Sequence, residues 1–219
     1  SLDLAKEVQQ NLLPAKNPHF PGLDIAGISL YCDETGGDYY DFFDSSAAEA
    51  RRYGVVIGDV SDHGIASALL MASARAFLRQ RSALSGSIAD IVGDVNRQLI
   101  QDVEDTGRFL TLFYLQIDMT HRRLSWVRAG HDAAVIYDPQ QDEFEELMGT
   151  GLALGVDQHY EYEEYLKNGL QRAACHRFAT LKQLQRTLDT IKRQKEAARC
   201  RVVRARIQRD DFTFDIDNG

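Results

Sequence analysis

Aspartates stand on short turns at three places in the chain. The turns are Gly36-Gly37-Asp38, Gly58-Asp59 and Asp210-Asp211. Glycine lets a backbone turn sharply and approach a ligand closely, and carboxylate oxygens are ligands that hard cations such as Mg²⁺ and Mn²⁺ prefer. Two such ions close together can deprotonate a shared water and polarise a phosphoryl oxygen. The three turns together therefore indicate a metal site that serves phosphoryl chemistry.

Each turn taken alone has a simpler explanation. A Gly-Gly-Asp sequence is often only a turn, Asp59 could counter the dipole of the helix that follows it, and the Asp210-Asp211 pair is typical of a solvated loop. The order and context of the three turns favour the metal site. Two histidines, His63 and His131, titrate near neutral pH, but turn-stabilising hydrogen bonds explain both more simply. Neither is predicted to be catalytic.

Apolar spacing predicts short strands around these turns and helices between them. Strands are expected at 25–31, 39–43, 53–57, 109–117, 124–129, 133–137, 200–207 and 212–216. Helices are expected at 4–13, 66–79, 87–100 and 174–199, with Ser87 as a possible N-cap of the third. Strands, then two consecutive helices, then more strands indicate an α+β layered architecture with largely antiparallel sheets.

The composition is typical of a soluble globular protein, with 44% hydrophobic and 26% charged residues in 219. No apolar run approaches the roughly 18 residues needed to cross a bilayer, and the N-terminus lacks the order of a secretory signal. Three cysteines without a CxxC spacing argue against a disulfide framework or a zinc site. We therefore expect a cytoplasmic protein without a membrane partner.

The net charge of −8 is unevenly distributed. Residues 1–171 carry 13 Lys and Arg against 27 Asp and Glu, whereas residues 172–209 carry 12 against 2. A basic segment can mean a nucleic-acid contact, but the solvated face of one basic helix is the simpler interpretation. Phe178 is the only aromatic residue in the segment, so the stacking that single strands require is missing. No nucleic-acid partner is expected.

Longer stretches around the three turns closely resemble the metal-dependent (PPM, type 2C-like) serine/threonine protein phosphatases, and among them the bacterial SpoIIE-like branch. The resemblance covers roughly residues 4–170 and 209–216. It rests on five segments in order: "VQQNLLP" with "TGGDYYDFF", "VVIGDVSDHGIASALLMASARAFLR", "TLFYLQIDMTHRRLSWVRAGHDAAVIYD", "GTGLALGV" and "RDDFTF".

The resemblance implies a four-layer α-β-β-α sandwich, with two antiparallel sheets flanked by helices and two Mn²⁺ or Mg²⁺ ions at one edge. Asp38 and Asp59 would be the catalytic metal ligands, with Asp59 bridging both ions. The backbone carbonyl of Val60 and the carboxylate of Asp210 would complete the set, with Asp211 outside it. The implied reaction is direct attack of a metal-bridged hydroxide on phosphoserine or phosphothreonine, without a covalent enzyme intermediate.

The same resemblance implies a place in signalling. Residues 1–14 would form a linker-like helix and residues 15–219 the phosphatase domain. The helix suggests an output domain attached to an upstream sensor or receiver module, and its stripe of Leu4, Val8 and Leu12 could form a homodimer. It could equally be a first helix packed against the core. The implied substrate is a phosphoserine anti-sigma antagonist in a partner-switching pathway that frees a sigma factor.

One part of the family pattern is absent. The family reaches a Thr-Asp-Gly motif, whose aspartate binds metal, through a further strand, but no Asp-Gly pair stands between Gly169 and Asp210. Three explanations are open. A segment is missing from the chain between Gln171 and Arg172, or one ligand has been lost and the protein is a weak enzyme or a partner-binding pseudophosphatase. The third is a damaged reading frame, which the intact "RDDFTF" argues against.

Overall fold

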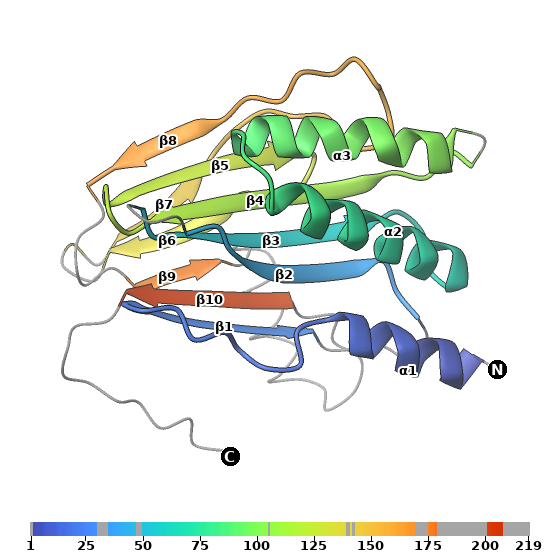
Figure 1. The fold of residues 1–219 in the computed structure, drawn as a ribbon, viewed down its shortest axis with the longest axis horizontal. Helices are drawn as coiled ribbons and strands as arrows, with labels where there is room; N and C mark the ends of the chain where they lie inside the picture. The colour runs from blue at the N-terminus through green and yellow to red at the C-terminus, as the bar shows by residue number, and fades with distance from the viewer. Residues whose placement is uncertain are drawn as a thin grey trace.

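Two five-stranded antiparallel sheets form the centre of the protein (Figure 1). The computed structural model describes residues 2–29, 35–46, 50–104, 106–138, 141, 143–169, 175–178 and 201–207. The first sheet, called the site sheet below, has the order β2 (Asp38–Asp44), β3 (Arg52–Val60), β4 (Leu110–Asp118), β5 (Arg123–Ala129), β8 (Tyr165–Asn168). The second sheet has the order β1 (Leu23–Ser29), β10 (Arg201–Ile207), β9 (Cys175–Phe178), β6 (Ala134–Asp138), β7 (Glu143–Leu147).

In the described residues, three helices accompany the sheets: α1 (Leu2–Leu12), α2 (Ile65–Ser82) and α3 (Ile88–Val103). Helices α2 and α3 lie side by side over the site sheet, α2 against β2 and β3 and α3 against β5 (Figure 1). Helix α3 begins at a capping box in which Ser87 and Asp90 bind each other's backbone N–H, as expected for an N-cap. Of the helices in the described ranges, none has the length and apolar character needed to cross a membrane.

The central strands of the site sheet are buried on both faces. Val55 and Val56 are adjacent on β3, point to opposite faces, and are both buried, as are Tyr114 and Leu115 on β4. One face meets the helices, and a single core cluster joins the other face to Ile25 and other residues of the second sheet. These strands therefore read as continuous apolar runs in the sequence.

The α+β fold with two antiparallel sheets is confirmed, but one expected helix is partly wrong. Within the range 174–199, Cys175–Phe178 is strand β9, which pairs with β10 and β6. The apolar repeat that predicted the helix starts only at Phe178, so pairing with β10 decides the conformation before it. Residues 179–200 of that expected helix, and the strand expected at 212–216, lie outside the described residues.

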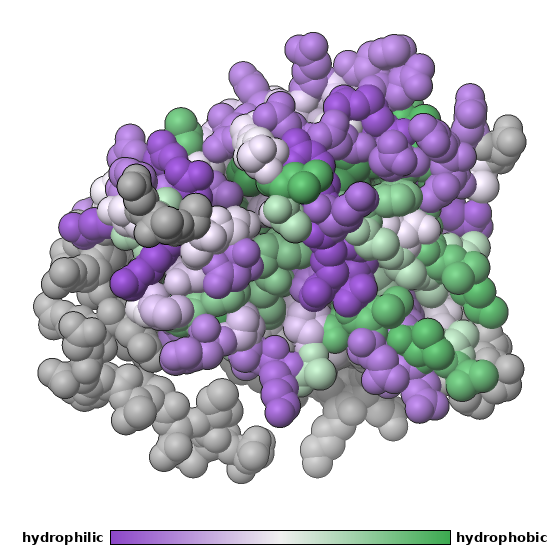
Figure 2. Space-filling view, viewed as in Figure 1, coloured by the Kyte–Doolittle hydropathy of each residue, from purple (hydrophilic) through white to green (hydrophobic). Residues whose placement is uncertain are grey.

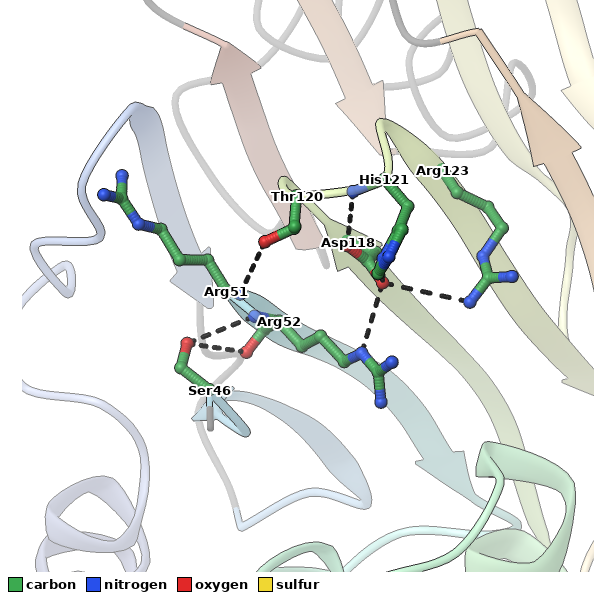
Figure 3. Close-up of polar contacts among 7 residues, drawn as sticks. All are labelled: Ser46, Arg51, Arg52, Asp118, Thr120, His121 and Arg123. Atoms are coloured by element: carbon green, nitrogen blue, oxygen red, sulfur yellow. Dashed lines mark hydrogen bonds and ion pairs between the residues drawn. The ribbon is translucent and has the colours of Figure 1, made fainter. Parts of the chain in front are cut away.

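The end of the site sheet where β3 begins is closed by the buried carboxylate of Asp118 (Figure 3). Its oxygens lie 3.2 Å from Arg52 Nε, 2.9 Å from His121 Nδ1 and 3.8 Å from Arg123 Nη2. Burial raises the pKa of Asp118, but the hydrogen bonds from His121 and Arg52 outweigh it, and the pKa is lowered. Asp38 and Asp59, the predicted metal ligands, lie at the opposite end of the β2–β3 pair. The polar network around Asp118 therefore stabilises the sheet and does not contact them.

Candidate metal centre

Asp38 and Asp59 come together across the β2–β3 pair. They are direct partners in the antiparallel register, Asp38 at the first residue of β2 and Asp59 next to the last of β3. Directly opposed residues project from the same face with Cβ atoms about 5 Å apart. Both are partly exposed. Opposed carboxylates repel each other, and a divalent cation held between them would turn that repulsion into attraction.

Gly37 brings the preceding turn against the carbonyl group of Val60. The Val60 N–H donates to the Gly37 carbonyl at 3.1 Å. A Cβ atom built on Gly37 would lie 2.4 Å from the Val60 carbonyl oxygen, a distance that no side chain tolerates. Only glycine allows this approach, and it sets the predicted Val60 ligand beside the turn that carries Asp38.

The loop from Ser61 to Gly64 is tied to its surroundings through its backbone. The Ser61 N–H donates to the Phe109 carbonyl at 2.8 Å, and the Gly64 N–H donates to the Thr35 carbonyl at 3.1 Å. Gly64 has a φ of 86° and precedes α2 directly, which suits glycine. The first bond holds the loop after Asp59 to the residue before β4, and the second holds it to the segment that leads into Asp38.

His131 is buried and is linked to Asp59 through the hydroxyl of Thr111. The hydroxyl of Thr111, the residue opposite Asp59 on β4, donates to the Asp59 carbonyl at 3.2 Å and lies 2.9 Å from His131 Nδ1. The hydroxyl has one hydrogen, so Nδ1 carries a proton and donates to it. Burial lowers the pKa of His131 to about 4, and the imidazole is neutral near pH 7. This environment supports the interpretation of His131 as a residue that orders the turn. The other candidate, His63, is exposed.

Gln9, which the sequence analysis did not single out, contacts the same region. Its side-chain amide donates from Nε2 to the Gly36 carbonyl and accepts the Gly36 N–H at Oε1, the latter at 3.1 Å. Gln9 belongs to the "VQQNLLP" segment. Gln9 could be recognised from the sequence only if the buried face of its helix were known, because a buried polar side chain needs partners. The sequence does not reveal which face is buried.

The donors brought together in the described residues are oxygens. They are the carboxylates of Asp38 and Asp59 and, beside them, the carbonyl of Val60; Asp210 and Asp211 lie outside the described residues. Where the structure describes the chain, no cluster of three or more His, Cys, Asp or Glu side chains is arranged to hold a metal. Hard oxygens in small number fit Mg²⁺ or Mn²⁺, which keep several waters.

The family model for Stage II sporulation protein E (SpoIIE) matches residues 49–169, more than half of the chain. The chain belongs to the SpoIIE family. The protein named phosphoserine phosphatase RsbU from Bacillus subtilis (strain 168) is 30% identical over 164 residues, which cover 75% of this chain and 48% of RsbU. The chain therefore spans about half the length of that relative.

Solved PP2C phosphatase domains share the fold of this chain. The PP2C phosphatase domain of SpoIIE from Bacillus subtilis superposes with a TM-score of 0.67 at 13% identity, covering 84% of this chain and 63% of that one. The SiaA-PP2C domain of Pseudomonas aeruginosa gives 0.67 at 18% identity, covering 95% and 96%. At these identities the likeness shows the fold, and it confirms the sandwich that the family resemblance implies.

Proposed function

We propose that this chain is a metal-dependent protein serine/threonine phosphatase that acts on a phosphoserine regulatory protein. The observation that carries the proposal is the direct opposition of Asp38 and Asp59 at one end of the site sheet. Membership of the SpoIIE family and the similarity to a protein named phosphoserine phosphatase RsbU support the reaction and the substrate class.

The chain's own residues would hold and orient the cations. Asp38 and Asp59, the Val60 carbonyl and Asp210 would bind two Mn²⁺ or Mg²⁺ ions. When bound, such ions supply Lewis acidity toward a phosphoryl group and lower the pKa of water. Gly37 sets the Val60 carbonyl beside the Asp38 turn. His131 is neutral and buried behind Asp59, so it orders the site and is not expected to transfer protons.

The test is hydrolysis of a generic aryl phosphate with Mn²⁺, before and after chelation. We expect wild-type turnover to vanish with the chelator and Asp59→Asn to lose at least about 100-fold in kcat. Asp44→Asn is the matched control, because Asp44 is an exposed aspartate at the opposite end of the β2–β3 pair. Activity that survives chelation, or a fully active Asp59→Asn variant, would contradict the proposal.

The outward face of α1 supports an upstream module or a second copy as partner. Leu4 is 60% and Val8 55% exposed, and surface apolar side chains gather over α1 and the start of α2 at the lower right of Figure 2. We propose a cytoplasmic output domain of a larger regulator, acting on an anti-sigma antagonist in a partner-switching pathway. Sedimentation of wild type against Leu4→Glu/Val8→Glu tests the homodimer, which the double variant would separate.

A non-catalytic binding module is the second candidate function. It is favoured by one observation, the lack of an Asp-Gly pair between Gly169 and Asp210. It predicts binding of the phosphorylated partner without turnover, and binding that Asp38→Asn and Asp59→Asn leave unchanged. Folded wild-type protein that binds the partner but hydrolyses neither the aryl phosphate nor the phosphoprotein would favour it.

A further inference from the structure

Helix α1 buries a glutamine against the protein, rather than Leu4 and Val8 of its apolar stripe. Gln9 is 4% exposed and Leu13, just beyond the helix, is buried, whereas Leu4 and Val8 are largely exposed. A buried amide is costly unless both its donor and its acceptor are satisfied. A glutamine at this position therefore needs specific polar partners.

Both halves of the Gln9 amide bind one residue, Gly36. Nε2 donates to the Gly36 carbonyl, and Oε1 accepts the Gly36 N–H at 3.1 Å. The two hydrogen bonds form a cyclic pair, like the paired bonds of an antiparallel ladder. A side chain of α1 thus fixes both backbone polar groups of a residue far along the chain.

Gly36 belongs to the turn that leads into Asp38, and its neighbours are held from other directions. The Gly37 carbonyl accepts the Val60 N–H, and the Thr35 carbonyl accepts the Gly64 N–H. Residues 35–37 are therefore fastened by β3, by the start of α2 and by Gln9. Of these, Gln9 alone belongs to α1.

We infer that Gln9 is a positioning residue for the metal site. Through Gly36 it holds the turn so that Asp38 stands opposite Asp59. This inference rests on the proposed function, because it assigns Gln9 to the same site. Without the amide, the turn keeps its bonds to Val60 and Gly64 but loses its contact with α1, and Asp38 is held less firmly beside Asp59.

The experiment compares Gln9→Leu, Gln9→Glu and Gln10→Leu with wild type. Leucine is similar in size to glutamine but cannot form hydrogen bonds, and glutamate keeps the acceptor but sets an oxygen against the Gly36 carbonyl. Gln10 is the matched control, because it is the exposed neighbour in the same helix. The readouts are Mn²⁺ affinity by calorimetry, Mn²⁺-dependent hydrolysis, amide exchange of residues 35–39 and the melting temperature.

We expect Gln9→Leu and Gln9→Glu to weaken Mn²⁺ binding by about 10-fold or more, with hydrolysis partly restored at saturating Mn²⁺. Exchange in residues 35–39 should rise in both variants, and Gln10→Leu should match wild type. If Gln9 only stabilised the fold, the melting temperature would fall while the Mn²⁺ affinity measured well below it stayed that of wild type, which would overturn the inference.

The failure of this inference differs from failure of the proposed function. Wild type that binds Mn²⁺ and hydrolyses phosphate, with Gln9→Leu binding Mn²⁺ equally well, overturns the role of Gln9 alone. Wild type that neither binds Mn²⁺ nor hydrolyses phosphate overturns the proposed function. In that case amide exchange still tests Gln9. Exchange at residues 35–39 that is the same in Gln9→Leu as in wild type overturns the positioning role as well, whereas faster exchange in the variant supports the role of Gln9 in holding this turn.

Discussion

Asp38 and Asp59 face each other directly across β2 and β3, at the end of the pair where β2 begins and β3 ends. The register of the hairpin therefore brings together two carboxylates that the sequence keeps apart. Their exposure to solvent gives a cation access from outside. The Val60 carbonyl, packed against Gly37, adds a third oxygen beside them.

Mn²⁺ should stabilise the wild-type protein and should not stabilise Asp59→Asn. Binding to the folded state alone adds about 2.7 kcal/mol at a concentration 100 times the Kd. For a domain of this size that corresponds to a rise in Tm of roughly 5–10 °C. Thermal melting with Mn²⁺ and with chelator measures the difference, and Asp44→Asn should keep the full rise. An equal rise in Asp59→Asn would place the ion elsewhere.

Two adjacent glycines should respond differently to alanine. In Gly37→Ala the new Cβ would lie 2.4 Å from the Val60 carbonyl oxygen, whereas in Gly36→Ala the nearest atom, the Asp38 nitrogen, is 3.9 Å away. We expect Gly37→Ala to lose about 1–3 kcal/mol of stability and to require more Mn²⁺ for half-maximal activity. Gly36→Ala should behave as wild type. Urea unfolding and Mn²⁺ titration test both, and equal effects would argue against the close approach at Gly37.

The sequence predicted the elements whose burial is strong and missed those whose burial is weak. The continuous apolar runs of β3 and β4 and the helix of α3 were found because both faces of the strands, or one full face of the helix, are covered. Strands β7 and β8 were missed because they are edge strands with mostly exposed side chains. Their conformation comes from pairing with a neighbour, which leaves little trace in hydrophobic spacing.

The residues of the candidate site that carry metal-binding side chains were predictable from the sequence. A residue that acts by hydrogen bonding to a distant backbone was not. Asp38 and Asp59 were identified from residue type and turn glycines, and the structure brings them together. Gln9 was not, because the apolar stripe of Leu4, Val8 and Leu12 does not show which face of α1 packs against the protein. Which face of an amphipathic helix turns inward depends on hydrogen bonds to a distant backbone, here that of Gly36.

Breaking the Asp41–Arg79 pair should destabilise the fold. Asp41 is 1% exposed and accepts two hydrogen bonds of 2.6 Å from Arg79, which joins α2 to β2. Arg79→Met would leave a buried carboxylate with only the Tyr39 hydroxyl and a backbone N–H. We expect a loss of about 3 kcal/mol, at the lower end for buried pairs because Arg79 is 45% exposed.

Urea unfolding measures that loss, with Arg97→Met as control. Arg97 pairs with Asp94 on the exposed side of α3, where a pair one helical turn apart contributes about 0.5 kcal/mol or less. Equal losses in the two variants would mean that burial of Asp41 adds nothing to its interaction with Arg79.

Stability should fall as the pH falls from about 6.5 to 4, in part because of His131. Burial lowers its folded-state pKa to about 4, against about 6.5 in an unfolded chain. Between these values the unfolded state binds a proton that the folded state does not, so the free energy of unfolding decreases as the pH decreases. The contribution is fully present above pH 6.5 and amounts to at most about 3 kcal/mol.

His131→Asn, which keeps a donor toward Thr111, should lack this component. Urea unfolding of both proteins in chelator at several pH values isolates the component as a difference, and parallel curves would show that His131 is protonated in the folded protein as readily as in the unfolded chain.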